Sequence, residues 1–143
     1  MQFTITRHGV PLGQVELAHA REINTVDFRP LAGYAAISAV VSEARRAMRG
    51  ELYVTGGSMM AAEDAAFERA MAAWRALNAD LELRDGEGRL VPTTALELHD
   101  EEEHSPCWLW LATIVFAEAP VAVPATSPRR SGEGSAEQDA PAP

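Results

Sequence analysis

Hydrophobic and polar residues alternate along the first part of the chain, which is the pattern of a β-strand with one buried face. Phe3 and Ile5 alternate with polar neighbours, and the same alternation returns at Val15 and Leu17. The residues in between include two glycines and a proline, which are typical of a turn. The pattern predicts a β-hairpin over residues 3–17.

The spacing then changes from two residues to three or four, which is the period of a helix with one buried face. Residues 18–29 are polar and irregular, and only Val26 to Phe28 is expected to be extended. Pro30 suits the first position of a helix, and Gly50 suits its left-handed end. The apolar face of this predicted helix consists of Tyr34, Ile37, Val41, Ala44 and Met48.

A second helix is predicted after a short strand at residues 51–55. The breaker Gly56-Gly57 is followed by Ser58, a residue that favours the N-cap position, and the helix should run to about Leu77. Its apolar stripe consists of Met60, Phe67, Met71, Trp74 and Leu77.

The last part of the predicted domain returns to a strand period. A hairpin is expected over residues 81–91, and Pro92 should restrict its second strand to an edge or a bulge. A strand at residues 95–99 should lead into an acidic loop at residues 100–103. Residues 107–116 are apolar on both faces, which is typical of a central strand covered by helices.

These elements predict an α+β fold: a two-layer sandwich with two helices on one face of an antiparallel, four- or five-stranded sheet. Residues 1–117 should form a single domain. Residues 118–143 are rich in Pro, Ala, Ser and Gly and contain no aromatic residue, so a disordered tail is expected.

Charge and cysteine content restrict the classes of partner and compartment. The net charge of −9 argues against nucleic acid and anionic membrane surfaces as partners. All 12 basic residues are arginine, so lysine-dependent chemistry is excluded. A single cysteine excludes an internal disulfide framework, and the N-terminus lacks the pattern of a secretory signal. We therefore expect a cytoplasmic protein, and the alanine- and arginine-rich composition indicates a bacterial one.

The densest set of potential metal ligands lies in the predicted acidic loop. Imidazole and carboxylate groups suit zinc, iron, nickel or manganese. The two histidines are five residues apart, however, and not the four that would place both on one face of a helix. The candidate ligands are His99, Glu101, Glu103 and His104.

A candidate partner surface is formed by the predicted last strand and the acidic loop. Trp108 and Trp110 share one face of their strand, because they lie two residues apart. They either pack as core beneath Trp74 and Phe67 or face outward as an anchor for a partner. Asp100 and Glu102 of the acidic loop would attract a basic partner surface.

No motif of a catalytic centre is present, and two weaker features have ordinary structural explanations. Gly56-Gly57-Ser58 resembles an anion-binding turn but also a simple helix cap. Cys107 lies close to His104 in sequence and could be a nucleophile, yet a buried structural thiol is the better explanation.

The leading hypothesis is a non-enzymatic accessory or regulatory protein that binds another protein or itself and needs no cofactor. The alternatives are a small metal-binding protein or metal-dependent enzyme, and a structural subunit of a larger assembly.

Overall fold

The computed structural model describes residues 1–50, 59–104 and 107–118 and shows an α+β architecture. For residues 59–62, 102–104 and 107–108 only the backbone is described. The elements in chain order are β1 (Gln2–Arg7), β2 (Val10–Glu16), β3 (Ile23–Pro30), the 3₁₀ helix η1 (Ala32–Ala36), α1 (Ser38–Met48), α2 (Met59–Ala79), β4 (Leu81–Arg84), β5 (Leu90–Val91), β6 (Thr93–His104) and β7 (Cys107–Phe116).

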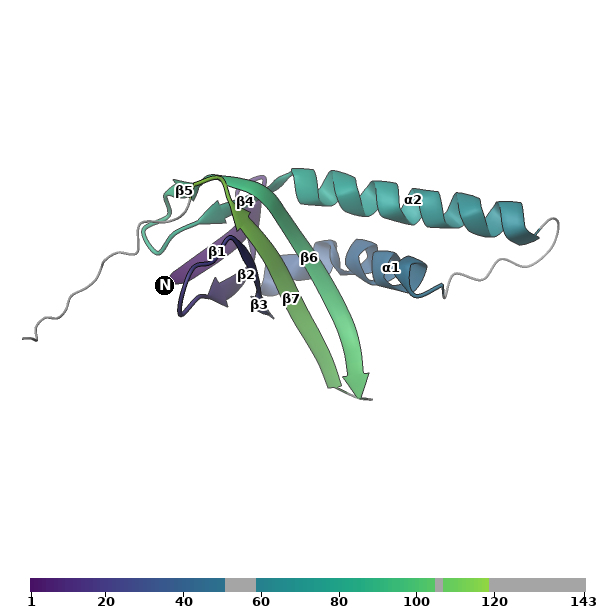
Figure 1. The fold of residues 1–143 in the computed structure, drawn as a ribbon, viewed down its shortest axis with the longest axis horizontal. Helices are drawn as coiled ribbons and strands as arrows, with labels where there is room; N and C mark the ends of the chain where they lie inside the picture. The colour runs from purple at the N-terminus through teal and green to yellow at the C-terminus, as the bar shows by residue number, and fades with distance from the viewer. Residues whose placement is uncertain (51–58, 105–106, 119–143) are drawn as a thin grey trace, which may run out of the picture.

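The strands in the described ranges form one antiparallel, seven-stranded sheet in the order β5-β4-β1-β2-β3-β7-β6. The prediction of four or five strands was wrong, although the α+β class is confirmed. The sheet curls until β4 approaches β6, so it is nearly a barrel and not the flat layer of a sandwich. The two helices lie side by side and both contact β6 (Figure 1).

Both hairpins predicted from alternation are confirmed. β1 pairs with β2, and His8 and Gly9 between them have positive φ angles of 51° and 79°. Glycine adopts such angles without a steric penalty, which makes the tight reversal possible. β4 pairs with the two-residue β5, which ends before Pro92 and lies at the edge of the sheet as expected.

The segment predicted to be irregular contains a full strand, β3. This strand pairs with β2 through Phe28 and its neighbours and with β7 along Ile23–Asp27, so it joins the two parts of the sheet. The alternation was hidden because a polar residue, Asn24, occupies a buried position. Its side-chain amide donates hydrogen bonds to the carbonyls of Arg21 and Ile114, which compensates for the burial.

The first predicted helix begins later than expected. Pro30 ends β3, a 3₁₀ turn follows, and α1 starts only at Ser38. Gly33 lies in that turn, where an added Cβ would come within 2.4 Å of the Pro11 carbonyl oxygen, so only glycine fits. Gly50 has a φ of +69°, which confirms the predicted left-handed end.

The main core fills the inside of the curled sheet. The predicted helix face from Tyr34 to Ala44 is buried, whereas Met48 is 50% exposed. A second, smaller cluster lies between the helices and contains Trp74 and Met71 against alanines of both helices. The main core consists of Phe3, Ile5, Leu12, Val15, Leu17, Phe28, Tyr34, Ile37, Val41, Leu77, Leu81, Leu83, Leu96, Leu98, Ala112, Ile114 and Phe116.

The predicted acidic loop was also wrong, because residues 100–103 continue β6 without interruption. The long apolar partner strand β7 holds this acidic sequence in register from Ala95 to Glu102. Pairing with β7 therefore overrides the low strand propensity of aspartate and glutamate. β7 lies between β3 and β6, one strand from the edge and not in the middle of the sheet. The predicted strand at residues 51–55 and most of the predicted tail lie outside the described residues.

Candidate functional site

The free edge of β6 is capped by α2 at one position. Leu98 donates its backbone N–H to Asn78 Oδ1 (3.3 Å), and its carbonyl accepts a hydrogen bond from the indole N–H of Trp74 (2.8 Å). The Trp74 ring also packs on the His99 ring, with centroids 5.3 Å apart. Both polar groups of Leu98 thus find partners on a helix, which protects this part of the edge from pairing with another chain.

Asp100, two residues further along β6, is held by α1 through its side chain. Asp100 is only 5% exposed, and its carboxylate accepts hydrogen bonds from Ser42 Oγ and from Arg45 Nε (2.9 Å). The Arg45 side chain is itself largely buried. Removing one member of such a pair leaves an uncompensated buried charge, so this contact fixes the angle between α1 and β6.

The charge of this ion pair acts on the hydroxyl of a buried tyrosine, Tyr34. Tyr34 is 6% exposed, and its hydroxyl has no hydrogen-bond partner among the described residues. Burial raises the pKa of Tyr34 above its ordinary range, and the negative charge of Asp100 raises it further. The hydroxyl therefore remains protonated and cannot act as a general base near neutral pH.

A small cleft of about 190 Å³ opens beside the ion pair, between α1 and β6. Its chemistry is mixed: Arg49 and Met48 line one side, and His99 and Glu101 line the other. Asp100 is already engaged by α1, and His99 contacts the carboxylate of Glu97 at 3.6 Å. Within the described side chains the cleft thus lacks a nucleophile paired with a base, the minimum that covalent catalysis requires.

Beyond Asp100 the β6–β7 hairpin projects past the rest of the sheet. The pairing of β3 with β7 ends at the Asp27–Leu111 pair, and β6 is the edge strand. Residues 101–104 and 107–110, here called the ribbon, consequently pair only within the β6–β7 hairpin in the described structure. Figure 1 shows the two strands running out together, past the side of α1.

Comparison with known proteins finds no matching family model, no matching curated protein and no matching solved structure. The geometry of the chain is the remaining evidence for its function.

The register of the hairpin brings together the four residues predicted to bind a partner. Asp100 is opposite Trp110, and Glu102 is opposite Trp108. Residues directly opposite in an antiparallel pair share a face of the sheet, so these four positions form one patch. Asp100 is already neutralised by Arg45, which leaves the other three positions at the outer end.

The indole of Trp110 packs against the main core and is partly buried. It does not join Trp74, which belongs to the cluster between the helices, and Phe67 is 39% exposed. Trp110 also lines a cavity of about 860 Å³ together with residues of β2 and β3. Trp110 therefore anchors the inner end of the ribbon to the core. The side chain of Trp108 lies outside the described residues.

The predicted metal ligands occupy successive positions of an extended strand. His99 and Glu101 share one face of β6, whereas Glu103 lies at a shift in register and His104 follows it. Among the side chains that the structure describes, no three groups suited to a metal lie together. The prediction of a metal site remains a prediction, because Glu103 and His104 are not among those side chains. The anion-binding turn at residues 56–58 and the Cys107 side chain lie outside the described residues.

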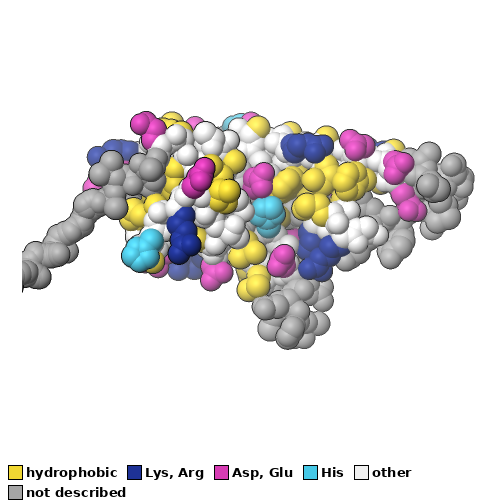
Figure 2. Space-filling model, in the orientation of Figure 1, with side chains coloured by type: hydrophobic (Ala, Val, Ile, Leu, Met, Phe, Trp, Pro, Cys, Tyr) yellow, Lys and Arg dark blue, Asp and Glu magenta, His cyan; other side chains and the backbone are white. Residues whose placement is uncertain are grey.

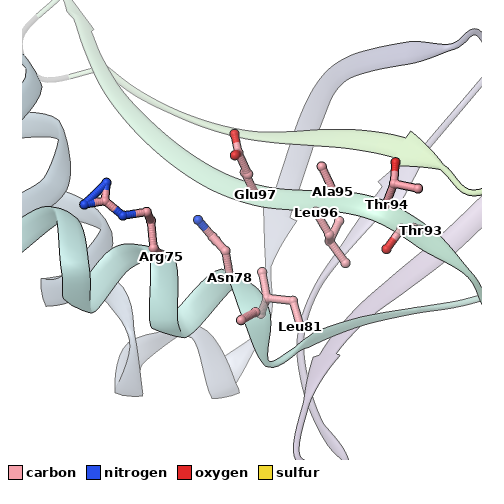
Figure 3. A pocket seen from close by; sticks show the side chains of 9 residues that line it. Arg75, Asn78, Leu81, Thr93, Thr94, Ala95, Leu96 and Glu97 are labelled. Atoms are coloured by element: carbon pink, nitrogen blue, oxygen red, sulfur yellow. The ribbon is translucent and has the colours of Figure 1, made fainter.

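A second opening marks the seam where the curled sheet fails to close. It measures about 320 Å³ and lies between the end of α2, the start of β4 and the free edge of β6. Figure 3 shows Leu96 pointing across the seam toward Leu81, whereas Thr94 and Glu97 point away from it. The seam is thus an incomplete closure of the core and contains no converging set of reactive groups.

Hydrophobic side chains are also exposed on the helical side of the molecule. Figure 2 shows them gathered along α2 and near its crossing with β6, between acidic and basic groups. Met48 and Phe67 are exposed apolar residues of α1 and α2. None of the helices in the described ranges has the length and apolarity needed to cross a bilayer.

Sequence reasoning missed the groups that hold the base of the ribbon. Ser42, Arg45 and Asn78 were not among the candidate residues. Their contacts with β6 join positions that are 58, 55 and 20 residues apart. The one available signal was the arginine beside an otherwise apolar helix face, because a buried aspartate needs such a partner.

Proposed function

We propose that this chain is a non-enzymatic protein-binding module and that the ribbon is its contact surface. A single observation carries the proposal: the outer end of the β6–β7 hairpin extends beyond the pairing with β3, and Figure 1 shows it running out past α1. Strand edges are normally short, capped or covered, because they otherwise pair with other chains. Here α2 caps the backbone edge of β6 at Leu98, α1 holds the side chain of Asp100, and the strand then continues for four more residues to His104.

Charge supports a basic protein as the partner. Residues 101–103 are all glutamate, in a chain whose net charge is −9. Charges of this kind accelerate the encounter with an oppositely charged surface and repel another acidic chain. The proposal places the protein among cytoplasmic bacterial accessory or regulatory proteins that act by contact.

The test uses a charge-reversed ribbon and a control reversed elsewhere. The ribbon variant carries Glu101→Arg, Glu102→Arg and Glu103→Arg. The control carries Glu22→Arg, Asp64→Arg and Glu68→Arg, which change the net charge equally at exposed positions outside the ribbon. Proteins retained from a lysate are identified by mass spectrometry, and each complex is reconstituted and measured by native mass spectrometry.

The expected result is a partner that binds the wild type and the control but not the ribbon variant. Equal retention by all three proteins would show that the ribbon is not the contact surface. A wild-type protein that remains strictly monomeric and retains no partner would overturn the proposed function altogether.

A further inference from the structure

The outer part of β6 has a free edge whose orientation follows from its inner part. Leu98 directs its N–H and carbonyl to α2 and therefore away from β7. Backbone groups of successive strand residues alternate in direction, so Asp100 and Glu102 also turn theirs away from β7. The register has no shift between Ala95 and Glu102, and the alternation holds over that length.

Among the described residues, α1 lies near this strand beyond Asp100 only at the cleft that Met48 and Arg49 line together with Glu101. The sheet ends at β6, α2 bonds to it at Leu98, and α1 bonds to it at Asp100. Further out, the same alternation turns the N–H and carbonyl of Glu102 away from β7. The edge is therefore a template to which another extended segment can add by main-chain hydrogen bonds.

From this geometry we infer that the outer edge of β6 binds an extended, basic segment of a partner protein as an additional strand. This inference rests on the proposed function. It specifies how the ribbon would bind, by strand addition, and the chemistry of the partner, a basic segment. Residues 101–103 place three glutamates along the docking strand. Arginine or lysine side chains of an added strand lie opposite or diagonal to these carboxylates, where cross-strand pairs of opposite charge stabilise the sheet.

A second copy of this chain is a poorer occupant of the same edge. Two β6 strands paired edge to edge would set glutamates against glutamates, and like charges directly opposite each other are destabilising. Charged residues on an edge are a common means of preventing self-pairing. The acidic edge thus disfavours pairing with a second copy of the chain and favours pairing with a basic strand.

The probe for this inference is a capped synthetic peptide of alternating arginine and valine residues. Its control has the same sequence with N-methylated valines, which preserves the charge but removes main-chain donors. Binding to the full chain is measured by fluorescence anisotropy at low and high salt. Strand addition predicts that N-methylation weakens binding at least about tenfold, since several main-chain hydrogen bonds are lost.

Two variants of one residue separate strand pairing from charge. Glu102→Pro removes an N–H that faces outward, so pairing with β7 is kept while the docking edge is blocked. Glu102→Gln removes the same charge and keeps the N–H. We expect Glu102→Pro to bind the unmethylated peptide roughly tenfold more weakly than Glu102→Gln does. Circular dichroism and thermal unfolding verify that both variants are folded.

Three outcomes would overturn the inference: no binding of the unmethylated peptide, equal binding of both peptides, or equal binding by the two Glu102 variants. If Glu102→Pro does not fold, the binding of the unmethylated and N-methylated peptides to the wild type still tests strand addition. If a captured partner requires the ribbon but tolerates Glu102→Pro, strand addition is wrong and the protein-binding role stands. If capture does not require the ribbon, the role itself is wrong.

Discussion

The inner and outer parts of strand β6 differ in how their free edge is treated. Along Thr93–Asp100 the strand has β7 on one side, α2 bonds to its free backbone edge at Leu98, and α1 bonds to the side chain of Asp100. Along residues 101–104 it has β7 alone in the described structure. The same strand is therefore part of the folded core at one end and an open edge at the other.

The difference between the two parts of β6 shows that specific polar contacts define where the open edge begins. Joining a helix to a strand through a buried aspartate carries a desolvation penalty, which the contacts with Arg45 and Ser42 must offset. Its position at the boundary between the two parts gives it a structural role. The contact fixes the base of the hairpin so that the outer end projects in one direction.

The largest effect is expected from removing the ion pair at this boundary. Asp100→Ala leaves the largely buried Arg45 without its carboxylate and should lower the free energy of unfolding by about 3 kcal/mol. Urea denaturation followed by circular dichroism measures this change. Glu101→Ala, one residue further out and exposed, should cost less than about 0.5 kcal/mol. Equal losses in the two variants would remove the distinction between the inner and outer parts of β6.

A smaller loss is expected from removing the cap that α2 provides. Trp74→Phe keeps an aromatic ring but removes the donor to the Leu98 carbonyl, which is then buried without a partner. The expected loss is about 2 kcal/mol, from the missing hydrogen bond and the smaller ring. Phe67→Leu, on the same helix but 39% exposed, is the matched control and should cost less than about 1 kcal/mol. A Trp74→Phe protein as stable as the wild type would show that the cap does not protect the edge.

The elements with clear periodicity could be predicted from the sequence. Alternation identified the two hairpins, and the three- to four-residue spacing identified both helices. β3 was missed because its inward position Asn24 is polar and is satisfied by contacts distant in sequence. The start of α1 was misplaced because Pro30 is as compatible with the end of a strand as with the first turn of a helix.

The candidate site was only partly predictable, for a different reason. Alternation placed Trp108 and Trp110 on one face, but the positions opposite them depend on the register of β6, which sequence does not provide. A run of four acidic residues has no alternation of polarity and low strand propensity, so a loop was the natural prediction. Its strand conformation depends on pairing with β7, and the burial of Asp100 depends on an arginine 55 residues away.

The smallest expected effect concerns Tyr34, whose pKa is raised by burial and by the nearby charge of Asp100. The folded state holds the phenol proton more tightly than the unfolded chain does, whose tyrosines titrate near 10.0. Stability from this source is complete below that pH and falls as the pH rises above it. In Tyr34→Phe the alkaline loss of stability should shrink. At neutral pH stability should change by less than about 1 kcal/mol, since the hydroxyl has no hydrogen-bond partner among the described residues.

Asp100→Asn separates the two causes of this titration, because it removes the charge and keeps the burial. Urea denaturation of wild type, Tyr34→Phe and Asp100→Asn, each at about pH 8 and about pH 11, measures the alkaline loss in all three. The loss should be largest in the wild type, intermediate in Asp100→Asn and smallest in Tyr34→Phe. An unchanged loss in Asp100→Asn would mean that the Asp100 charge is screened from Tyr34 by water. The boundary between the two parts of β6 would then be wetter than its buried ion pair implies, and the open edge would begin closer to the core.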